Sequence, residues 1–199
     1  MKLNLANLLT LFRIAAIPIV VICFYAPIPH SRPIAAILFG IAAVTDFIDG
    51  WVARNYGQTS RFGEFLDPVA DKLMVSTVLV MLVQAESGWF EDIIAMIIIG
   101  REITISALRE WMATIGERAN VKVSLSGKIK TTLQMFGIAF MVWEEKLLGI
   151  DIYTVGFVLL IAAAAMTVWS MFFYLKAAWP FIMNDSGGGD GPPESGVVP

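Results

Sequence analysis

Long apolar runs with few charged interruptions dominate the chain. Two runs contain no Lys, Arg, Asp or Glu, residues 14–31 and 152–175, and four shorter ones have an apolar body with a charged end, residues 33–45, 73–85, 93–100 and 131–143. A helix needs about 20 mostly apolar residues to cross a bilayer core about 30 Å thick, so the shorter bodies must continue through their charged ends. The pattern predicts an all-α integral membrane bundle of six transmembrane helices.

The two ends of the chain differ from this pattern. Leu5, Leu8, Leu9 and Phe12 fall on one helical stripe, which predicts an interfacial amphipathic helix over residues 1–12. Residues 184–199 are rich in Gly, Pro and acids, and such a segment buries too little apolar surface to order itself. We therefore expect a transmembrane domain over residues 13–183, followed by a disordered tail over 184–199.

Composition narrows the class of protein. Of the 199 residues 57% are hydrophobic and 16% are charged, and the mean hydropathy is +0.73, far from the balance of a soluble domain. A net charge of −3 is too small to suggest a nucleic-acid binder. Of the 14 Lys and Arg residues only Arg32 and Lys146 fall in the predicted outer loops. Because basic residues stay on the cytoplasmic side, both termini are expected there.

Four aspartates carry the candidate chemistry. Asp46 and Asp49 are spaced i, i+3 near the end of the second predicted helix, and Asp67 and Asp71 are spaced i, i+4 near the start of the third. Pro68 suits a first helical turn, which would put Asp67 at the helix start. A short loop makes the two helices antiparallel, so the four carboxylates should converge and require cations between them. Oxygen ligands without His or Cys favour a pair of Mg²⁺ or Mn²⁺ ions, which could neutralise a pyrophosphate during displacement at phosphorus.

Neighbouring residues suit a phosphate ligand. Gly50 removes a side chain where a ligand would approach, and Arg54 could pair with a phosphate through two hydrogen bonds. The plainer interpretation is that Asp46 and Asp49 only cap a helix end and pair with Arg54 and Arg61. Four acids at these spacings beside apolar runs favour the metal site.

The acids belong to a longer signature. Residues 46–71 contain eight identities, Asp46, Asp49, Gly50, Ala53, Arg54, Gly63, Asp67 and Asp71. They resemble, position for position, the signature of the CDP-alcohol phosphatidyltransferase family. Residues 7–13, 67–72, 101–111 and 127–132 are similar to the bacterial phosphatidylglycerophosphate synthase branch.

The resemblance implies a six-helix enzyme of the bacterial inner membrane, usually a homodimer, with a polar cavity open to the cytoplasm. Asp46, Asp49 and Asp67 would be metal ligands for two ions, and Asp71 both a ligand and the general base. The residues implied for binding CDP-diacylglycerol are Asp46, Gly50, Arg54 and Ser60, together with Asn7 and Thr10. The base would take a proton from sn-glycerol 3-phosphate, whose oxygen would attack the phosphorus bearing diacylglycerol while CMP leaves.

The acceptor's own phosphate needs cations that the acids do not supply. Candidates on the fourth and fifth predicted helices are Arg101, Arg109, Lys128 and Lys130. Arg101 follows an apolar run, where a charge is costly unless it lines a wet pocket. The alternative for the arginines is pairing with Glu102 or Glu110, and for the lysines it is anchoring at anionic lipid.

Two other functions stay open at this stage. A synthase of the same family could use serine, inositol phosphate or phosphatidylglycerol as acceptor. A cation or proton transporter would instead carry acids near the bilayer midplane and repeated halves. The acids here fall at one face and no repeat is visible, so the sequence favours the transferase.

Overall fold

The computed structural model describes residues 5–56, 61–86, 88–115 and 125–185 of the chain, and within them the side chains of residues 5–7, 46–56, 61–62, 64, 125–128 and 184–185 lie outside the description. The described residues form six α-helices: α1 (Leu5–Tyr25), α2 (Ser31–Tyr56), α3 (Arg61–Ala85), α4 (Trp89–Thr114), α5 (Leu125–Trp143) and α6 (Ile152–Asp185). The predicted all-α class with six helices is confirmed.

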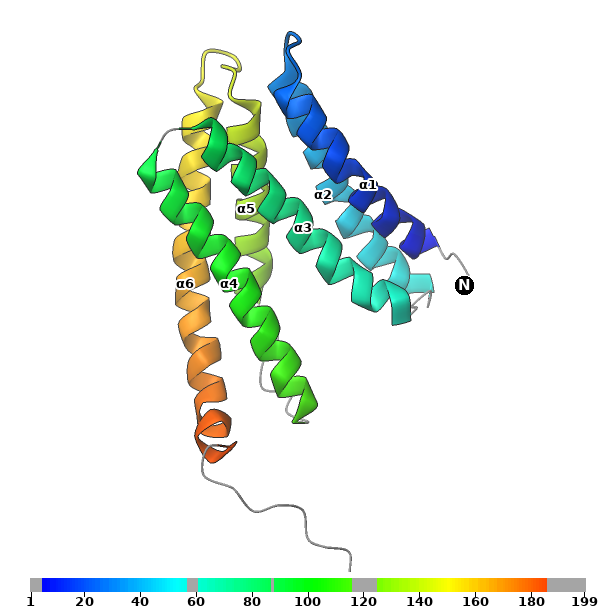
Figure 1. Cartoon of the computed structure of the whole chain (residues 1–199), viewed down its shortest axis with the longest axis vertical. Coiled ribbons are helices and arrows are strands. Elements are labelled where there is room, and N and C mark those ends of the chain that lie inside the picture. Colours follow the sequence, from blue (N-terminus) through cyan, green and yellow to red (C-terminus); the bar gives the residue numbers. More distant parts are fainter. Residues whose placement is uncertain (1–4, 57–60, 87, 116–124, 186–199) are drawn as a thin grey trace, which may run out of the picture.

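The helices alternate in direction, so their connections gather at two ends of the bundle (Figure 1). One end holds the starts of α1, α3 and α5 and the ends of α2, α4 and α6; we call it the site end. The opposite end holds the three remaining turns, between α1 and α2, α3 and α4, and α5 and α6. Helix α1 packs against both α2 and α3, and the most extensive pairing in the bundle joins α5 and α6.

Three helix boundaries differ from the expectations. Helix α1 runs from Leu5 to Tyr25 without a break, so the segment expected to form a separate interfacial helix continues into the first apolar run. Pro68 lies inside α3, which begins at Arg61, and not in a first turn; the preceding residues extend the helix by two turns although Pro68 donates no backbone hydrogen bond. Helix α6 ends at Asp185, inside the expected tail, and residues 186–199 lie outside the description.

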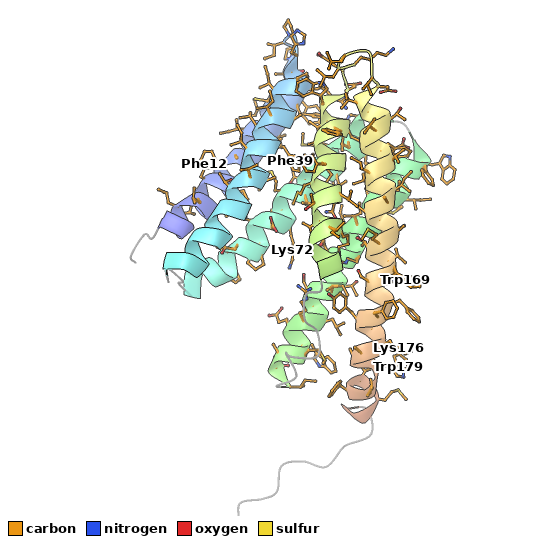
Figure 2. All side chains as sticks on the ribbon, turned by 180° about the vertical axis from the view of Figure 1, so that it is seen from behind. Phe12, Phe39, Lys72, Trp169, Lys176 and Trp179 are labelled. Atoms are coloured by element: carbon orange, nitrogen blue, oxygen red, sulfur yellow. The ribbon has the colours of Figure 1, made fainter. Side chains whose placement is uncertain are left out.

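Apolar surface marks the chain as a membrane protein. Two stretches are long and apolar enough to cross a bilayer by themselves, Leu8–Tyr25 in α1 and Ile152–Met183 in α6, and shorter apolar stretches occupy Ser31–Thr45 and Ile129–Trp143. Large apolar side chains point outward, among them Phe12, Trp169 and Trp179 (Figure 2). That all six helices cross the membrane stays a prediction.

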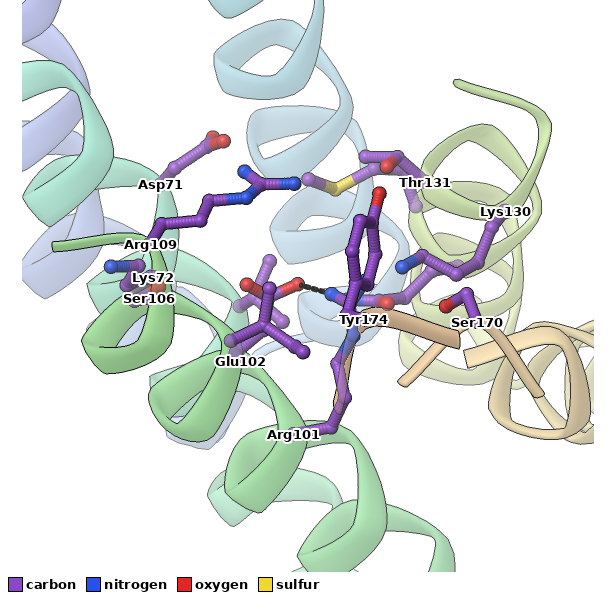
Figure 3. A pocket seen from close by; sticks show the side chains of 14 residues that line it. Asp71, Lys72, Arg101, Glu102, Ser106, Arg109, Lys130, Thr131, Ser170 and Tyr174 are labelled. Carbon is purple, nitrogen blue, oxygen red and sulfur yellow. Dashed lines mark hydrogen bonds and ion pairs between the residues drawn. The ribbon is translucent and has the colours of Figure 1, made fainter. Parts of the chain in front are cut away.

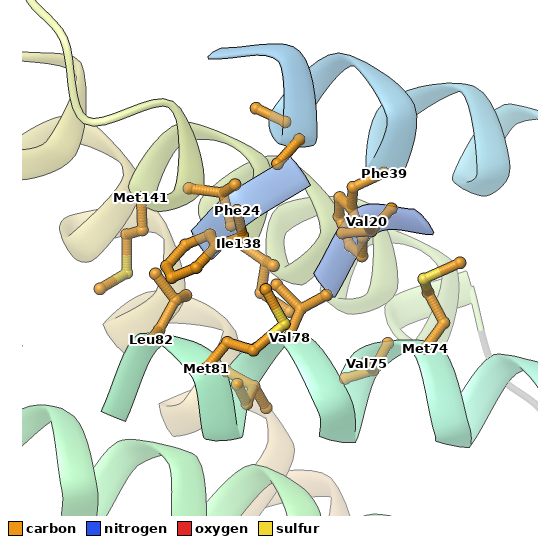
Figure 4. Packing of buried hydrophobic residues seen from close by; sticks show 14 of the residues in the cluster. Val20, Phe24, Phe39, Met74, Val75, Val78, Met81, Leu82, Ile138 and Met141 are labelled. Atoms are coloured by element: carbon orange, nitrogen blue, oxygen red, sulfur yellow. The ribbon is translucent and has the colours of Figure 1, made fainter. Parts of the chain in front are cut away.

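The main apolar core draws buried side chains from all six helices. Val20 and Phe24 from α1 pack with Phe39 from α2, Val78 from α3 and Ile138 from α5 (Figure 4). These side chains come from the middle and the opposite end of the bundle. The core therefore holds the helices together beside the polar residues of the site end without occupying that end.

Helices α5 and α6 approach each other through glycine. A Cβ atom on Gly156 would lie 2.7 Å from the carbonyl oxygen of Gly137, and one on Gly137 would lie 3.0 Å from the carbonyl oxygen of Gly156. Such close backbone contact is typical of membrane helix pairs, where packing replaces the hydrophobic effect. This crossing holds α6 against α5, and α6 continues from it to the site end.

Candidate active site

Two of the four signature acids are described, and both face α1. The Thr10 hydroxyl donates a hydrogen bond to Oδ1 of Asp67. One turn further, Nη1 of Arg13 lies 3.7 Å from Oδ1 of Asp71. Helices α1 and α3 run in the same direction. Thr10 and Arg13, spaced i, i+3 on α1, therefore lie opposite Asp67 and Asp71, which are spaced i, i+4 on α3. Helix α1 therefore orients both carboxylates.

Thr10 and Arg13 are fully buried, whereas Asp71 is part-exposed. Burying an arginine is costly unless an anion compensates its charge, and the Asp71 carboxylate supplies one. Arg13 was not among the site residues predicted from the sequence, although it falls with Thr10 on the polar side of the predicted N-terminal helix. Its spacing of three from Thr10 on the polar stripe of residues 1–13 is the signal that could have identified it.

A polar cavity of about 210 Å³ opens beside Asp71. Arg101 and Arg109 from α4 and Lys130 from α5 line it together with Asp71 (Figure 3). The structure thus brings together three of the four candidate acceptor-binding cations with one of the signature acids. The side chain of Lys128, the fourth candidate, lies outside the described residues.

The three cations differ in their partners. Nη1 of Arg101 donates to Oε1 of Glu102 at 2.6 Å, while its buried Nε has no hydrogen-bond partner in the described part of the chain. The guanidinium carbon of Arg109 lies 5.7 Å from the centre of the Tyr174 ring, a cation–π contact. Neither Arg109 nor Lys130 forms an ion pair with a described acid. Arg101 therefore both pairs with Glu102 and lines the cavity. The sequence analysis had treated these as two alternative roles.

Lys130 is only 3% exposed. A lysine that anchors a helix at anionic lipid must reach the membrane surface, so its burial argues against that alternative. A buried ammonium group at the wall of a polar cavity needs an anion there. The cavity consequently has room for an anionic ligand, and among the described residues that line it the cations outnumber the acids.

Helix α6 contributes two hydroxyl groups that sequence reasoning missed. Ser170 and Tyr174 line the cavity from the side facing Arg109 and Lys130 (Figure 3). With Thr167 they form a polar stripe at spacings of three and four in an otherwise apolar helix. That stripe was visible in the sequence. The sequence did not show which other helices this stripe of α6 faces.

Several expected site residues fall outside what the structure describes. Ser60 lies between α2 and α3 in the undescribed residues 57–60. The backbones of Asn7, Asp46, Asp49, Gly50 and Arg54 belong to α1 and α2, but their side chains lie outside the description. No group of three or more metal-binding side chains occurs among the described residues, which include only Asp67 and Asp71 of the four acids. These two oxygen donors, one helical turn apart, fit a hard divalent cation.

Comparison with known proteins assigns the family. A sequence model of the CDP-alcohol phosphatidyltransferase family matches residues 3–169. The chain belongs to this family. As a CDP-alcohol phosphatidyltransferase family member it is similar to enzymes named CDP-diacylglycerol–glycerol-3-phosphate 3-phosphatidyltransferase. The Yersinia enterocolitica protein is 49% identical over 184 residues, 92% of this chain and 100% of its own length. The Escherichia coli K12 and Shigella flexneri serotype 5b proteins are each 47% identical over 178 residues, 89% of this chain and 96% of theirs.

The family match ends before part of the cavity. Arg101, Arg109 and Lys130 lie inside residues 3–169, whereas Ser170 and Tyr174 lie beyond residue 169. The cavity of this family member therefore combines positions within the matched region with two hydroxyl groups beyond it.

Proposed function

We propose that the protein transfers the phosphatidyl group of CDP-diacylglycerol to sn-glycerol 3-phosphate, giving phosphatidylglycerophosphate and CMP. The observation that carries the proposal is the cavity in which Arg101, Arg109 and Lys130 lie beside Asp71. The names of the relatives, at 47–49% identity over about nine-tenths of the chain, support the same reaction.

The three cations suit the phosphate of the acceptor. Glycerol 3-phosphate carries a dianion, and serine, an acceptor used elsewhere in the family, carries no phosphate. Arg101 and Arg109 have planar forks that can each bind two phosphate oxygens, while Lys130 adds a point charge. In this arrangement the phosphate of the acceptor lies between α4 and α5, and its primary hydroxyl points toward Asp71.

Asp71 acts as the general base. Its carboxylate takes the proton of the primary hydroxyl, and the oxygen forms a bond to the phosphorus that bears the diacylglycerol group. The bond from that phosphorus to the oxygen of CMP breaks, and CMP leaves with the electron pair. Arg13 keeps the carboxylate oriented from the α1 side, and Thr10 does the same for Asp67.

The family depends in general on a divalent metal. Asp46, Asp49, Asp67 and Asp71 would hold two ions, Mg²⁺ or Mn²⁺, and these would supply positive charge to the phosphates of the donor. Gly50, Arg54 and Ser60 would bind the nucleotide and its phosphates, with Asn7 and Thr10 closing the site. The contact between Thr10 and Asp67 supports this position for α1, because it holds the helix beside a proposed metal ligand.

The distribution of basic residues supports an arrangement of the protein in the membrane. We propose that all six helices cross the bacterial inner membrane, that the site end and both termini face the cytoplasm, and that the protein is a homodimer. The connections at the opposite end and the helix turns next to them contain only two Lys or Arg residues, Arg32 in the first turn of α2 and Lys146 between α5 and α6, which agrees with an outward-facing side.

The proposal is tested by acceptor choice. Purified protein in detergent is incubated with CDP-diacylglycerol, Mg²⁺ and one acceptor at a time, and CMP release is measured. We expect release with glycerol 3-phosphate, and little with serine, inositol phosphate or phosphatidylglycerol. Release with serine but none with glycerol 3-phosphate would contradict the assignment of the acceptor. Chelation with EDTA should abolish release, and added Mg²⁺ or Mn²⁺ should restore it.

A further inference from the structure

A buried neutral side chain lines the polar cavity beside Asp71. Of the described residues around this cavity, three polar ones are buried, Arg101, Lys130 and Gln134. Arg101 and Lys130 are cations proposed to bind the phosphate of the acceptor (Figure 3). Gln134 is only 4% exposed and carries no charge, so its presence in the wall is not explained by attraction to a phosphate.

The amide of Gln134 has unused capacity for hydrogen bonds. It offers two N–H donors and a carbonyl oxygen as acceptor, and it bonds to no other residue in the described part of the chain. Buried polar groups in folded proteins nearly always have a partner, because leaving one without a hydrogen bond costs free energy. The contents of the cavity must therefore supply the partner of this amide.

The position of Gln134 places the amide beside the proposed phosphate site. Gln134 follows Lys130 on α5 by four residues, so both lie on one face of the helix, about 6 Å apart along its axis. Neutral groups on the facing helix α6 are already engaged. The Ser170 hydroxyl donates to the carbonyl oxygen of Thr167 at 2.9 Å, and the Tyr174 ring lies against Arg109. Gln134 thus remains available to a ligand.

The proposed acceptor has one polar group that still lacks a partner. Glycerol 3-phosphate carries a phosphate on C3, a primary hydroxyl on C1 and a secondary hydroxyl on C2. In the proposed function the cations bind the phosphate and Asp71 faces the primary hydroxyl. The secondary hydroxyl lies on the carbon between these two groups and is therefore enclosed in the same cavity. A hydroxyl both donates and accepts hydrogen bonds, and a neutral amide can satisfy both roles.

We propose that Gln134 binds the C2 hydroxyl of the acceptor and is a specificity-determining residue. The inference rests on the proposed function, because it assigns a residue to the remaining polar group of the proposed acceptor. A site that pairs a buried amide with a substrate hydroxyl rejects an analogue without that hydroxyl, since the amide then stays unpaired. Gln134 would thus distinguish a glycerol phosphate from other primary alcohols that carry a phosphate.

Removing the hydroxyl from the acceptor and the amide from the protein tests the proposal. 3-Hydroxypropyl phosphate keeps the phosphate and the primary hydroxyl of glycerol 3-phosphate but has no C2 hydroxyl. CMP release with CDP-diacylglycerol and Mg²⁺ gives kcat/KM for each acceptor. Gln134→Met keeps an unbranched side chain without the amide. Gln84→Met is the matched control, because Gln84 lies at the opposite end, where its carbonyl oxygen accepts a hydrogen bond from the Tyr25 hydroxyl at 2.7 Å.

We expect the wild-type protein to prefer glycerol 3-phosphate over 3-hydroxypropyl phosphate roughly 10- to 100-fold in kcat/KM. In Gln134→Met the two values should differ by less than about threefold, because activity with glycerol 3-phosphate falls while activity with the analogue stays near the wild-type level. Gln84→Met should keep the wild-type ratio. Thermal unfolding in detergent shows which variants are folded.

The outcomes separate this inference from the proposed function. Equal use of the two acceptors by the wild-type protein, or a wild-type ratio in folded Gln134→Met, would overturn the role of Gln134. An equal loss with both acceptors would also overturn it, because Gln134 would then bind the phosphate or support the shape of the cavity. If Gln134→Met fails to fold, Gln134→Leu takes its place, and the wild-type ratio tests the proposal in any case. Absence of CMP release by the wild-type protein with both acceptors would instead contradict the proposed reaction itself.

Discussion

Basic residues are used differently at the two ends of the bundle. At the opposite end Arg32 lies 2.9 Å from Glu86 and 2.9 Å from Glu144, and its guanidinium stacks 4.5 Å from the Phe24 ring. These contacts join α2 to α1 and to the residues that directly follow α3 and α5. At the site end, Arg109 and Lys130 line a cavity and pair with no described acid.

The difference indicates where an anionic ligand belongs. A cation removed from water needs an anion nearby. For Arg32 the protein itself provides two carboxylates from other segments, so the charge serves to hold helices together. Arg109 and Lys130 line a cavity whose two described acids, Asp71 and Glu102, form ion pairs with Arg13 and Arg101. A phosphate-bearing substrate would supply negative charge for Arg109 and Lys130.

The largest expected effect comes from the acid at the cavity. Asp71→Asn keeps the size of the side chain but removes the base, so kcat should fall roughly a thousandfold. CMP release under saturating substrates measures the loss. Glu86→Gln at the opposite end is the matched control and should keep the specific activity of the folded protein. Near-wild-type turnover in Asp71→Asn would show that another group accepts the proton.

A smaller loss is expected from the phosphate pocket. Arg101→Gln should lower kcat/KM for glycerol 3-phosphate roughly 10- to 100-fold, mainly by raising KM, because a charged hydrogen bond to the acceptor is lost. Arg101→Lys keeps the charge but lacks the planar guanidinium group. Its kcat/KM for glycerol 3-phosphate should lie between those of the wild type and Arg101→Gln. The KM for CDP-diacylglycerol should change little. An equal rise in both KM values would mean that Arg101 supports the fold of the site and does not bind the acceptor.

Much of the site end could be predicted from the sequence, because charged residues within or beside apolar runs are rare. Arg101 directly follows an apolar run, and this cost identified it as a pocket residue from the sequence. The spacing of Asp67 and Asp71 likewise predicted that both lie on one face of α3. The six helices followed from the lengths of the apolar runs alone.

Other features depended on how helices distant in sequence meet. Nothing in the order of residues indicates that Tyr174 stacks on Arg109, or that Thr10 reaches Asp67. An apolar cavity of about 460 Å³ between α2 and α5 is equally hidden, since small residues such as Gly40, Ala43 and Ala139 line it and become neighbours only in the bundle. Pro68 misled the prediction of the start of α3, because propensity weighs less than the packing of a whole helix.

At the opposite end the expected effect is on stability. Arg32→Gln leaves Glu86 and Glu144 without their shared cation, which should lower the free energy of unfolding by about 1–3 kcal/mol. Thermal unfolding in detergent measures the change, and CMP release per folded molecule should stay near the wild-type value. If Arg32→Gln instead lost as much activity as Arg101→Gln and kept its stability, basic residues at the two ends of the bundle would not differ in role.

The smallest effect concerns the start of α6 at the opposite end. The Asp151 carboxylate accepts hydrogen bonds from the Thr154 hydroxyl at 2.7 Å and the Thr154 backbone N–H at 3.3 Å. These bonds hold the pKa of Asp151 below its usual value. A carboxyl group whose pKa is lowered by folding stabilises the folded state above the unfolded pKa of about 4, and loses this contribution as the pH falls through the folded value.

Asp151→Ala should therefore lower the melting temperature by about 1–3 °C at pH 7, and this difference should shrink as the pH drops below about 4. Asp151→Asn keeps a capping side chain without a titrating group, so its melting temperature should lie closer to that of the wild type at pH 7. Differential scanning fluorimetry across this pH range measures both. A difference for Asp151→Ala that is the same at pH 7 and at pH 3 would mean that the uncharged contacts, and not the carboxylate charge, stabilise the start of α6.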